Sequence, residues 1–343
     1  MEQWFEAGVG SGAWRLYHSN DMSGTPLVIL CPGQGAQAVG MARAWYETSA
    51  EAKDVFERAD AVLEGRLGAR LSELCFQGPA ERLNKTDVSQ PAIYTASVAC
   101  WRGLLGTWGM GLGEASLAGA AGLSLGEYTA LCVAGAFTFE DGLELVSLRG
   151  RAMQEAAEAE PSSMLALIGA DEAQANTVCE KAAEGEVLVP ANFNAPGQIV
   201  LSGHKGAIGR AASVASGMGL RATELSVAGA FHSPLMAPAA ERLRAALEKT
   251  PIGQPRCPVW SNVTARAHAG EGVTGIAGEI RRRLVEQLTM PVRWAEGCAS
   301  MSAELGPKVG GAFHELAPGK TLAGLMRRID KNIKVITHEE PGS

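Results

Sequence analysis

The sequence predicts an α/β fold in which a small unit is inserted into a larger domain. The apolar run 27–31 has the character of a short buried strand and ends in a glycine-rich loop at 32–37. The small apolar residues of 117–122 lead through a second glycine-rich turn into a helical pattern, as parallel strands in α/β proteins do. Between 161 and 227 the order becomes β-α-β-β-α-β, which is the split βαβ or ferredoxin-like arrangement.

Hydrophobic spacing assigns the remaining elements. In the insertion we expect strands at 163–169, 186–192, 198–202 and 222–227 and helices at 171–183 and 206–217. In the larger domain we expect helical patterns across 41–108, a helix after the turn at 122–126, a helix at 140–159, a helix through 249, a strand at 258–262, a helix at 276–288, a strand beginning at 314 and a last helix that contains Leu322, Leu325 and Met326.

These patterns divide the chain into a core domain, an insertion and two ends. The ends have no clear period, and we expect the N-terminal one to be disordered. The predicted parts are an N-terminal extension at 1–25, a core domain at 26–160 and 228–335, a small subdomain at 161–227 and a C-terminal tail at 336–343.

Composition excludes several functional classes. The 343 residues are 46% hydrophobic and 20% charged, which suits a large buried core, and the net charge of −7 argues against general nucleic-acid binding. There is no apolar run of membrane-spanning length and no secretory leader, so we expect a cytoplasmic protein that does not contact membranes. The seven cysteines are scattered without a C-x-x-C pair, so we expect neither a disulfide framework nor a metal site.

The turn at 122–126, Gly-Leu-Ser-Leu-Gly, has the G-x-S-x-G pattern of a nucleophile elbow. In that turn the serine adopts a strained conformation, and the flanking glycines avoid a clash where the strand turns into the helix. Ser124 would then lie at a helix N-terminus, where free N–H groups favour an anionic oxygen. An ordinary glycine-rich turn is the alternative interpretation of the same five residues.

A serine nucleophile needs a base, and His232 is the histidine in the most distinctive context, Gly-Ala-Phe-His-Ser-Pro. Its position after Ser124 agrees with the order of the triad in α/β-hydrolases, so we expect an α/β-hydrolase-like core with a parallel sheet. No acidic residue between the two stands out as a third member. From these residues alone, a serine esterase or thioesterase and a binding module without chemistry both stay open.

Taken together, the motifs closely resemble the malonyl-CoA:acyl carrier protein transacylases, the acyltransferase family of fatty-acid and polyketide synthesis. The resemblance extends from about residue 26 to 335 and preserves the order and spacing of the motifs. The motifs are Gly-Gln-Gly-Ala-Gln at 33–37, Gly-Leu-Ser-Leu-Gly-Glu at 122–127, Arg-Gly-Arg at 149–151, Gly-Ala-Phe-His at 229–232 and Gln-Leu at 287–288 ahead of Pro-Val at 291–292.

The resemblance implies a role for each motif residue. Ser124 would be the acylated nucleophile and His232 its general base. The backbone N–H groups of Gln34 and Leu125 would form the oxyanion hole. The main-chain carbonyl of Gln287 would orient His232 in place of an acid.

The resemblance also implies a substrate carboxylate. Arg149 would hold the free malonyl carboxylate through two parallel hydrogen bonds, which an acetyl group cannot make. Phe231 would form an aromatic wall that suits an unbranched acyl group. Leu123 departs from the family pattern, in which histidine precedes the serine. We expect this leucine to leave activity intact and to affect selectivity slightly.

The implied reaction is a ping-pong transfer of malonyl from malonyl-CoA, through a malonyl-serine, to the phosphopantetheine thiol of acyl carrier protein. It needs no cofactor, and we expect the enzyme to be a monomer. Fatty-acid synthesis is the expected pathway, and a polyketide pathway is the alternative. Acidic carrier proteins need a basic landing face, for which the candidates are Arg281, Arg282, Arg283, Arg327 and Arg328.

Overall fold

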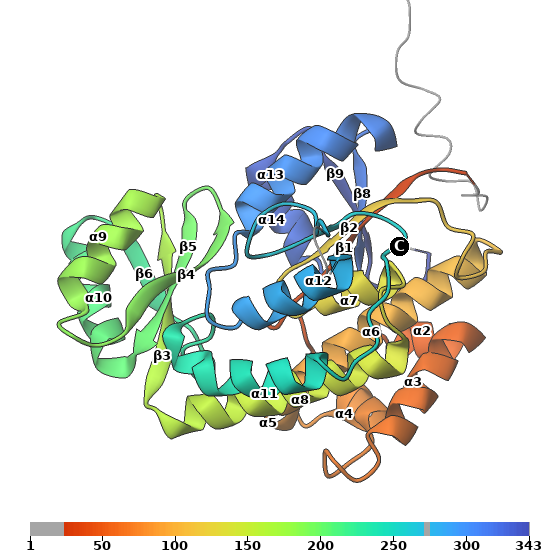
Figure 1. The fold of residues 1–343 in the computed structure, drawn as a ribbon, viewed down its shortest axis with the longest axis horizontal. Helices are drawn as coiled ribbons and strands as arrows, with labels where there is room; N and C mark the ends of the chain where they lie inside the picture. Colours follow the sequence, from red (N-terminus) through yellow and green to blue (C-terminus); the bar gives the residue numbers. More distant parts are fainter. Residues whose placement is uncertain (1–23, 271–274, 343) are drawn as a thin grey trace, which may run out of the picture.

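A computed structural model describes residues 24–270 and 275–342 (Figure 1). The larger domain is organised on a five-stranded sheet with the strand order β7-β2-β1-β8-β9, and every neighbouring pair in it is parallel. β1 therefore lies at the centre, between β2 and β8. The bounds of these strands are β1 Leu27–Cys31, β2 Leu117–Gly122, β7 Val259–Trp260, β8 Ala312–Leu316 and β9 Lys334–His338.

Helices cover both faces of this sheet. Alternate residues of β1 enter two separate cores, because successive side chains of a strand point to opposite faces. Leu27 and Ile29 pack with α2, α3, α4, α6, α7, α8, α11 and α12, whereas Val28 and Leu30 pack with α13 and α14. The helices are α2 Arg43–Thr48, α3 Ala50–Val62, α4 Leu71–Gln77, α6 Thr86–Thr107, α7 Gly126–Val133, α8 Phe139–Ala159, α11 Ala237–Leu247, α12 Gly275–Glu286, α13 Trp294–Leu305 and α14 Thr321–Ile329, with the short α5 Ala80–Leu83, η1 Pro234–Met236 and η2 Gly306–Val309.

The insertion forms a separate antiparallel sheet with the order β4-β5-β3-β6, at the left of Figure 1. Two helices pack on it around their own apolar core, and a capping box at Asp171 begins the first of them. The order along the chain is β-α-β-β-α-β, as the sequence predicts. The elements are β3 Ser162–Ile168, α9 Glu172–Ala182, β4 Leu188–Ala195, β5 Gln198–His204, α10 Lys205–Gly217 and β6 Arg221–Glu224.

One predicted boundary is wrong at the C-terminal end. Residues 336–338, which the sequence assigned to a tail, belong to β9, the edge strand that pairs with β8 from Ala312↔Lys334 to Leu316↔His338. The strand forms there because buried His338 packs on His314, with ring centroids 5.2 Å apart, and Trp108 lies edge-on to both. The predicted extension at 1–25 falls almost wholly outside the described residues. None of the helices within 24–270 and 275–342 has the length and apolar character to cross a membrane.

Candidate active site

Ser124 occupies the turn between β2 and α7 with a φ of 52°, in the left-handed region that non-glycine residues rarely adopt. The flanking glycines are required by space. A Cβ at Gly122 would overlap the backbone of Gly126, and a Cβ at Gly126 would overlap the carbonyl of Cys31. The Ser124 N–H donates to Asn262 Oδ1 at 2.6 Å, which fixes the strained turn. The local geometry is that of a nucleophile elbow.

His232 lies against the serine, in the loop that follows β6. Its Nε2 is 2.8 Å from Ser124 Oγ, and its Nδ1 is 2.7 Å from the main-chain oxygen of Gln287. With Nδ1 donating to that carbonyl, Nε2 is left as the acceptor for the hydroxyl proton. Burial and the nearby Arg149 charge lower the pKa of His232 to about 4, against the opposing effect of the Gln287 hydrogen bond. The imidazole is therefore neutral at pH 7, as a base must be.

The loop after β1 packs directly on the elbow. The Leu123 N–H donates to Cys31 O at 3.1 Å, and a Cβ at Gly33 would overlap the Leu123 carbonyl, so only glycine allows this approach. This packing brings the loop that carries Gln34 beside the start of α7, where Leu125 is the N-cap residue. Neither backbone N–H has a hydrogen-bond partner within the described part of the chain. Among residues 24–270 and 275–342, both N–H groups are thus without a protein acceptor near the elbow.

Arg149 comes from α8 and is 1% exposed. Its Nη2 donates to Ser124 Oγ at 3.0 Å and to Gln287 Oε1 at 2.9 Å, and its Nη1 donates to Gln90 Oε1 at 2.8 Å. Burial lowers its pKa, and its Nε has no hydrogen-bond partner among the described residues. Each group that accepts from the guanidinium is neutral, so this buried cation has no carboxylate in direct contact. An anionic substrate group beside Ser124 would supply that missing partner.

A cavity of about 440 Å³ opens above these residues, between the two sheets' domains. Leu123 and Phe231, the two predicted pocket residues, line it. So do Asn192 and Asn194 of β4, which means that the insertion forms one wall. The lining comprises Gln34, Gly35, Gln37, Asn84, Leu123, Ser124, Met153, Met164, Asn192, Asn194, Val200, Leu225, Ser226, Val227, Phe231 and His232.

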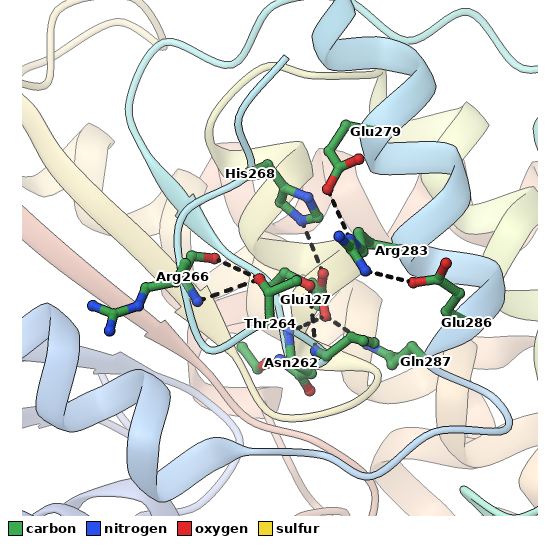
Figure 2. A network of polar contacts seen from close by, with 12 residues as sticks. Glu127, Asn262, Thr264, Arg266, His268, Glu279, Arg283, Glu286 and Gln287 are labelled. Carbon is green, nitrogen blue, oxygen red and sulfur yellow. Dashed lines mark hydrogen bonds and ion pairs between the residues drawn. The ribbon is translucent and has the colours of Figure 1, made fainter. Parts of the chain in front are cut away.

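Three polar residues beneath the site were given no role from the sequence: Glu127, which ends the motif at 122–127, Asn262 and Gln90. Figure 2 shows Glu127 at the centre of a buried network with Asn262, His268 and the side chain of Gln287. The signal that could have revealed Glu127 is its position as the only charge in the apolar helix GEYTALCV. Asn262 and Gln90 lie far from Ser124 in sequence and carry no comparable local signal.

The predicted basic face on α12 is largely neutralised by its own helix. Arg283 lies between Glu279 and Glu286, to which it donates at 2.7 and 2.8 Å (Figure 2), and Arg282 pairs with the same two acids. Arg281 donates instead to the carbonyls of Leu247 and Thr250. The cause is i,i+3 and i,i+4 spacing, which puts opposite charges side by side on a helix. Arg282 and Arg283 are therefore charge-compensated and Arg281 is held by main-chain carbonyls, so a docking role for these three arginines stays a prediction.

The other basic candidates, Arg327 and Arg328, are exposed at the end of α14. Arg328 Nη2 donates to the Pro196 carbonyl at 3.0 Å, in the turn that follows the cavity residue Asn194. The end of α14 is thereby tied to the segment that forms one wall of the cavity.

Comparisons with known proteins agree with this geometry. The model of the acyl transferase domain family matches residues 28–334. The chain is 40% identical over 322 residues to the malonyl CoA-acyl carrier protein transacylase of Escherichia coli O157:H7, covering 93% of this chain and 97% of that protein. It is similar to the crystal structure of the malonyl-CoA:acyl carrier protein transacylase of Xanthomonas oryzae, with a TM-score of 0.82, 40% identity and coverage of 93% and 96%.

A third similarity is to a malonyl-transacylase solved in complex with a type II PKS acyl-carrier protein, with a TM-score of 0.82, 36% identity and coverage of 92% and 96%. These matches cover 92–93% of this chain and 96–97% of the relatives. The chain belongs to the acyl transferase domain family and, within it, to the malonyl-CoA:acyl carrier protein transacylases.

Proposed function

We propose that the chain transfers malonyl from malonyl-CoA to the phosphopantetheine thiol of acyl carrier protein through a malonyl-Ser124 intermediate. One observation carries the proposal: Ser124 Oγ lies 2.8 Å from a neutral imidazole and 3.0 Å from a buried guanidinium. The imidazole can accept the proton of a serine nucleophile. The guanidinium can pair with an acyl group that ends in a carboxylate. The names of the relatives, which are malonyl transacylases, point to the same reaction.

In the first half-reaction His232 Nε2 accepts the hydroxyl proton as Ser124 Oγ attacks the thioester carbonyl of malonyl-CoA. The backbone N–H groups of Gln34 and Leu125 stabilise the resulting oxyanion, and each such donor supplies about 3 to 4 kcal/mol. The imidazolium then gives its proton to the sulfur of coenzyme A, which leaves as the thiol. The Gln287 carbonyl, 2.7 Å from Nδ1, holds the ring in orientation throughout.

In the second half-reaction the phosphopantetheine thiol of the carrier protein replaces coenzyme A. His232 deprotonates it, the thiolate attacks the malonyl-serine ester, and the serine oxygen regains the proton. Arg327 and Arg328 are the basic residues that we propose to attract an acidic carrier, because both are exposed and Arg328 contacts the turn that follows the cavity wall. The complex of a related transacylase with an acyl-carrier protein supports the carrier as a partner.

Selectivity for malonyl follows from the pocket. Arg149 exchanges a neutral acceptor such as the serine hydroxyl for the substrate carboxylate, a charge-assisted pair that acetyl cannot offer. Phe231 narrows the cavity beside the acyl group, and Leu123 contributes an apolar side chain there. Discrimination against one extra methyl is worth about 1 to 3 kcal/mol in such a pocket.

The finer architecture is a further part of the proposal. We infer an α/β-hydrolase-like core at 26–160 and 228–335 and a ferredoxin-like subdomain at 161–227, because the elbow follows a parallel strand and the inserted sheet has the order β4-β5-β3-β6. A monomeric, cytoplasmic enzyme without a cofactor stays a prediction, as does the absence of nucleic-acid and membrane partners.

Intact-mass spectrometry after exposure to malonyl-CoA tests the proposal. We expect a malonyl adduct on the wild type, its absence in Ser124→Ala, and its transfer to holo acyl carrier protein. Free malonate released without malonyl-carrier product would instead indicate the esterase or thioesterase alternative. A panel of fatty-acid and polyketide carriers, compared by kcat/KM, assigns the pathway.

A further inference from the structure

Glu127 is a buried carboxylate three residues after Ser124, and the reaction described above makes no use of it. It is fully buried, in the first turn of α7. A buried carboxylate is costly unless its oxygens accept hydrogen bonds, and the oxygens of Glu127 contact three residues that are distant from it in sequence. Its Oε2 accepts from Asn262 N at 3.0 Å and from Gln287 Nε2 at 2.7 Å, and its Oε1 lies 2.9 Å from His268 Nε2.

Each of the first two contacts leads to Ser124 by one further step. Asn262, whose backbone N–H is fixed by Glu127, accepts the Ser124 N–H at 2.6 Å through Oδ1 and donates to Gly122 O at 2.7 Å through Nδ2. The Gln287 side chain, fixed by the same carboxylate oxygen, also donates to Ser124 O at 3.0 Å. Both sides of the elbow are therefore anchored on one carboxylate, whose contacts with Asn262 and Gln287 can be followed in Figure 2.

Gln287 extends the chain of contacts to the other two functional groups. Its main-chain oxygen is 2.7 Å from His232 Nδ1, and its side-chain oxygen accepts from Arg149 Nη2 at 2.9 Å. The amide thus stands between the Arg149 guanidinium and the Glu127 carboxylate. Because of this separation, Glu127 gives the buried cation a nearby negative charge without occupying the guanidinium face that a substrate carboxylate would take.

We propose that Glu127 is a positioning residue for acyl transfer, holding Gln287 and Asn262 so that His232, Arg149 and the Ser124 elbow keep their mutual alignment. The inference rests on the proposed acyl transfer. It assigns no contact with substrate to Glu127. The decisive property is the length of the side chain, because it places Oε2 within hydrogen-bonding distance of both Asn262 and Gln287.

Two substitutions separate reach from charge. Glu127→Gln keeps the side-chain length, and its amide oxygen can accept from Asn262 and Gln287 while its NH₂ donates to His268 Nε2. That arrangement needs the His268 proton on Nδ1, an atom that has no hydrogen-bond partner among the described residues. Glu127→Asp keeps the charge but withdraws the oxygens by one bond, so it cannot span both anchors.

The measurement is the single-turnover rate of Ser124 acylation by malonyl-CoA, per folded protein, with malonyl and acetyl-CoA compared. We expect Glu127→Gln to stay within about fivefold of the wild type and Glu127→Asp to lose on the order of 10- to 100-fold, because a displacement of about 1 Å at a catalytic group has that effect. We also expect Glu127→Asp to lower the ratio of malonyl to acetyl acylation, since Arg149 loses its fixed acceptor.

Glu315→Asp is the matched control. Glu315 is a second fully buried glutamate, which accepts from Leu322 N at 2.8 Å and Ala323 N at 2.7 Å at the start of α14. Shortening it should lower the Tm and leave the acylation rate per folded protein within about twofold. A purely structural role for Glu127 predicts the same behaviour for Glu127→Asp.

The proposal is overturned if folded Glu127→Asp acylates within about twofold of the wild type, or if Glu127→Gln loses as much as Glu127→Asp, which would show that the reach of the side chain alone does not keep the site aligned. If Glu127→Asp does not fold, Gln287→Leu decides, because it keeps the main-chain carbonyl and removes the side-chain anchor. An unchanged acylation rate in that variant also overturns the proposal. Failure of the wild type to acquire any Ser124 adduct would instead refute the proposed function.

Discussion

Replacing Arg149 with alanine should convert a malonyl-selective enzyme into an unselective one. The guanidinium is buried, and it presents Nη2 next to Ser124 Oγ, at 3.0 Å. A malonyl carboxylate held there would make two charge-assisted hydrogen bonds, each contributing about 1.5 to 3 kcal/mol. Their sum, about 3 to 6 kcal/mol, corresponds to a fall of about 10²- to 10⁴-fold in kcat/KM for malonyl-CoA.

Acetyl transfer provides the internal reference, because any general damage from losing the contacts of Arg149 with Gln90 and Gln287 affects both substrates. We therefore expect the ratio of malonyl to acetyl kcat/KM to fall while acetyl transfer persists or rises. The matched control is Arg151→Ala, an exposed arginine two residues along α8, which should leave both rates unchanged. A preserved malonyl preference in Arg149→Ala would refute the assignment of this residue to the carboxylate.

Three further outcomes follow from the site and its supports. With the pKa of His232 lowered to about 4, the acid limb of the kcat/KM profile should lie near pH 4, because only protonation below that value removes the base; a limb near pH 6.5 on folded enzyme would contradict this. Gly126→Ala should abolish acylation and lower the Tm, since its Cβ would overlap Cys31 O. The control is Gly209→Ala, in open space on α10, which should raise the free energy of unfolding by about 0.5 to 1 kcal/mol. Similar effects of the two substitutions would contradict the packing argument. Arg327→Glu should raise KM for carrier protein in a salt-dependent way with the malonyl-CoA step unchanged, and an unchanged KM would remove α14 from the docking face.

The parts that sequence predicted well are those whose cause is local. The glycines around Ser124 are dictated by overlap with backbone a few residues away or on the adjoining strand, so the pattern itself carries the information. The same holds for the inserted unit, whose strands and helices follow regular spacing and whose first helix has its capping box in the sequence. The roles of His232, Arg149 and Gln287 came from family resemblance, and the structure brings these residues to Ser124.

The parts that escaped depend on contacts between distant segments. Nothing near Asn262 indicates that its amide holds a backbone group 138 residues earlier, and nothing near Gln90 indicates that it accepts from Arg149. The arginines of α12 that pair with Glu279 and Glu286 are a different case. These acids stand at helical spacing from them, so the ion pairs could have been predicted from the sequence.

The entry and exit of the inserted sheet meet at one point. Ser162 Oγ, at the start of β3, accepts the Ala230 N–H at 3.1 Å, just two residues before His232. The two connections to the insertion therefore lie side by side, so the insertion is attached to the larger domain at a single place. Exchange of 161–227 between relatives would change one wall of the cavity that receives the thioester. Ser124 and His232 would stay unchanged in the larger domain.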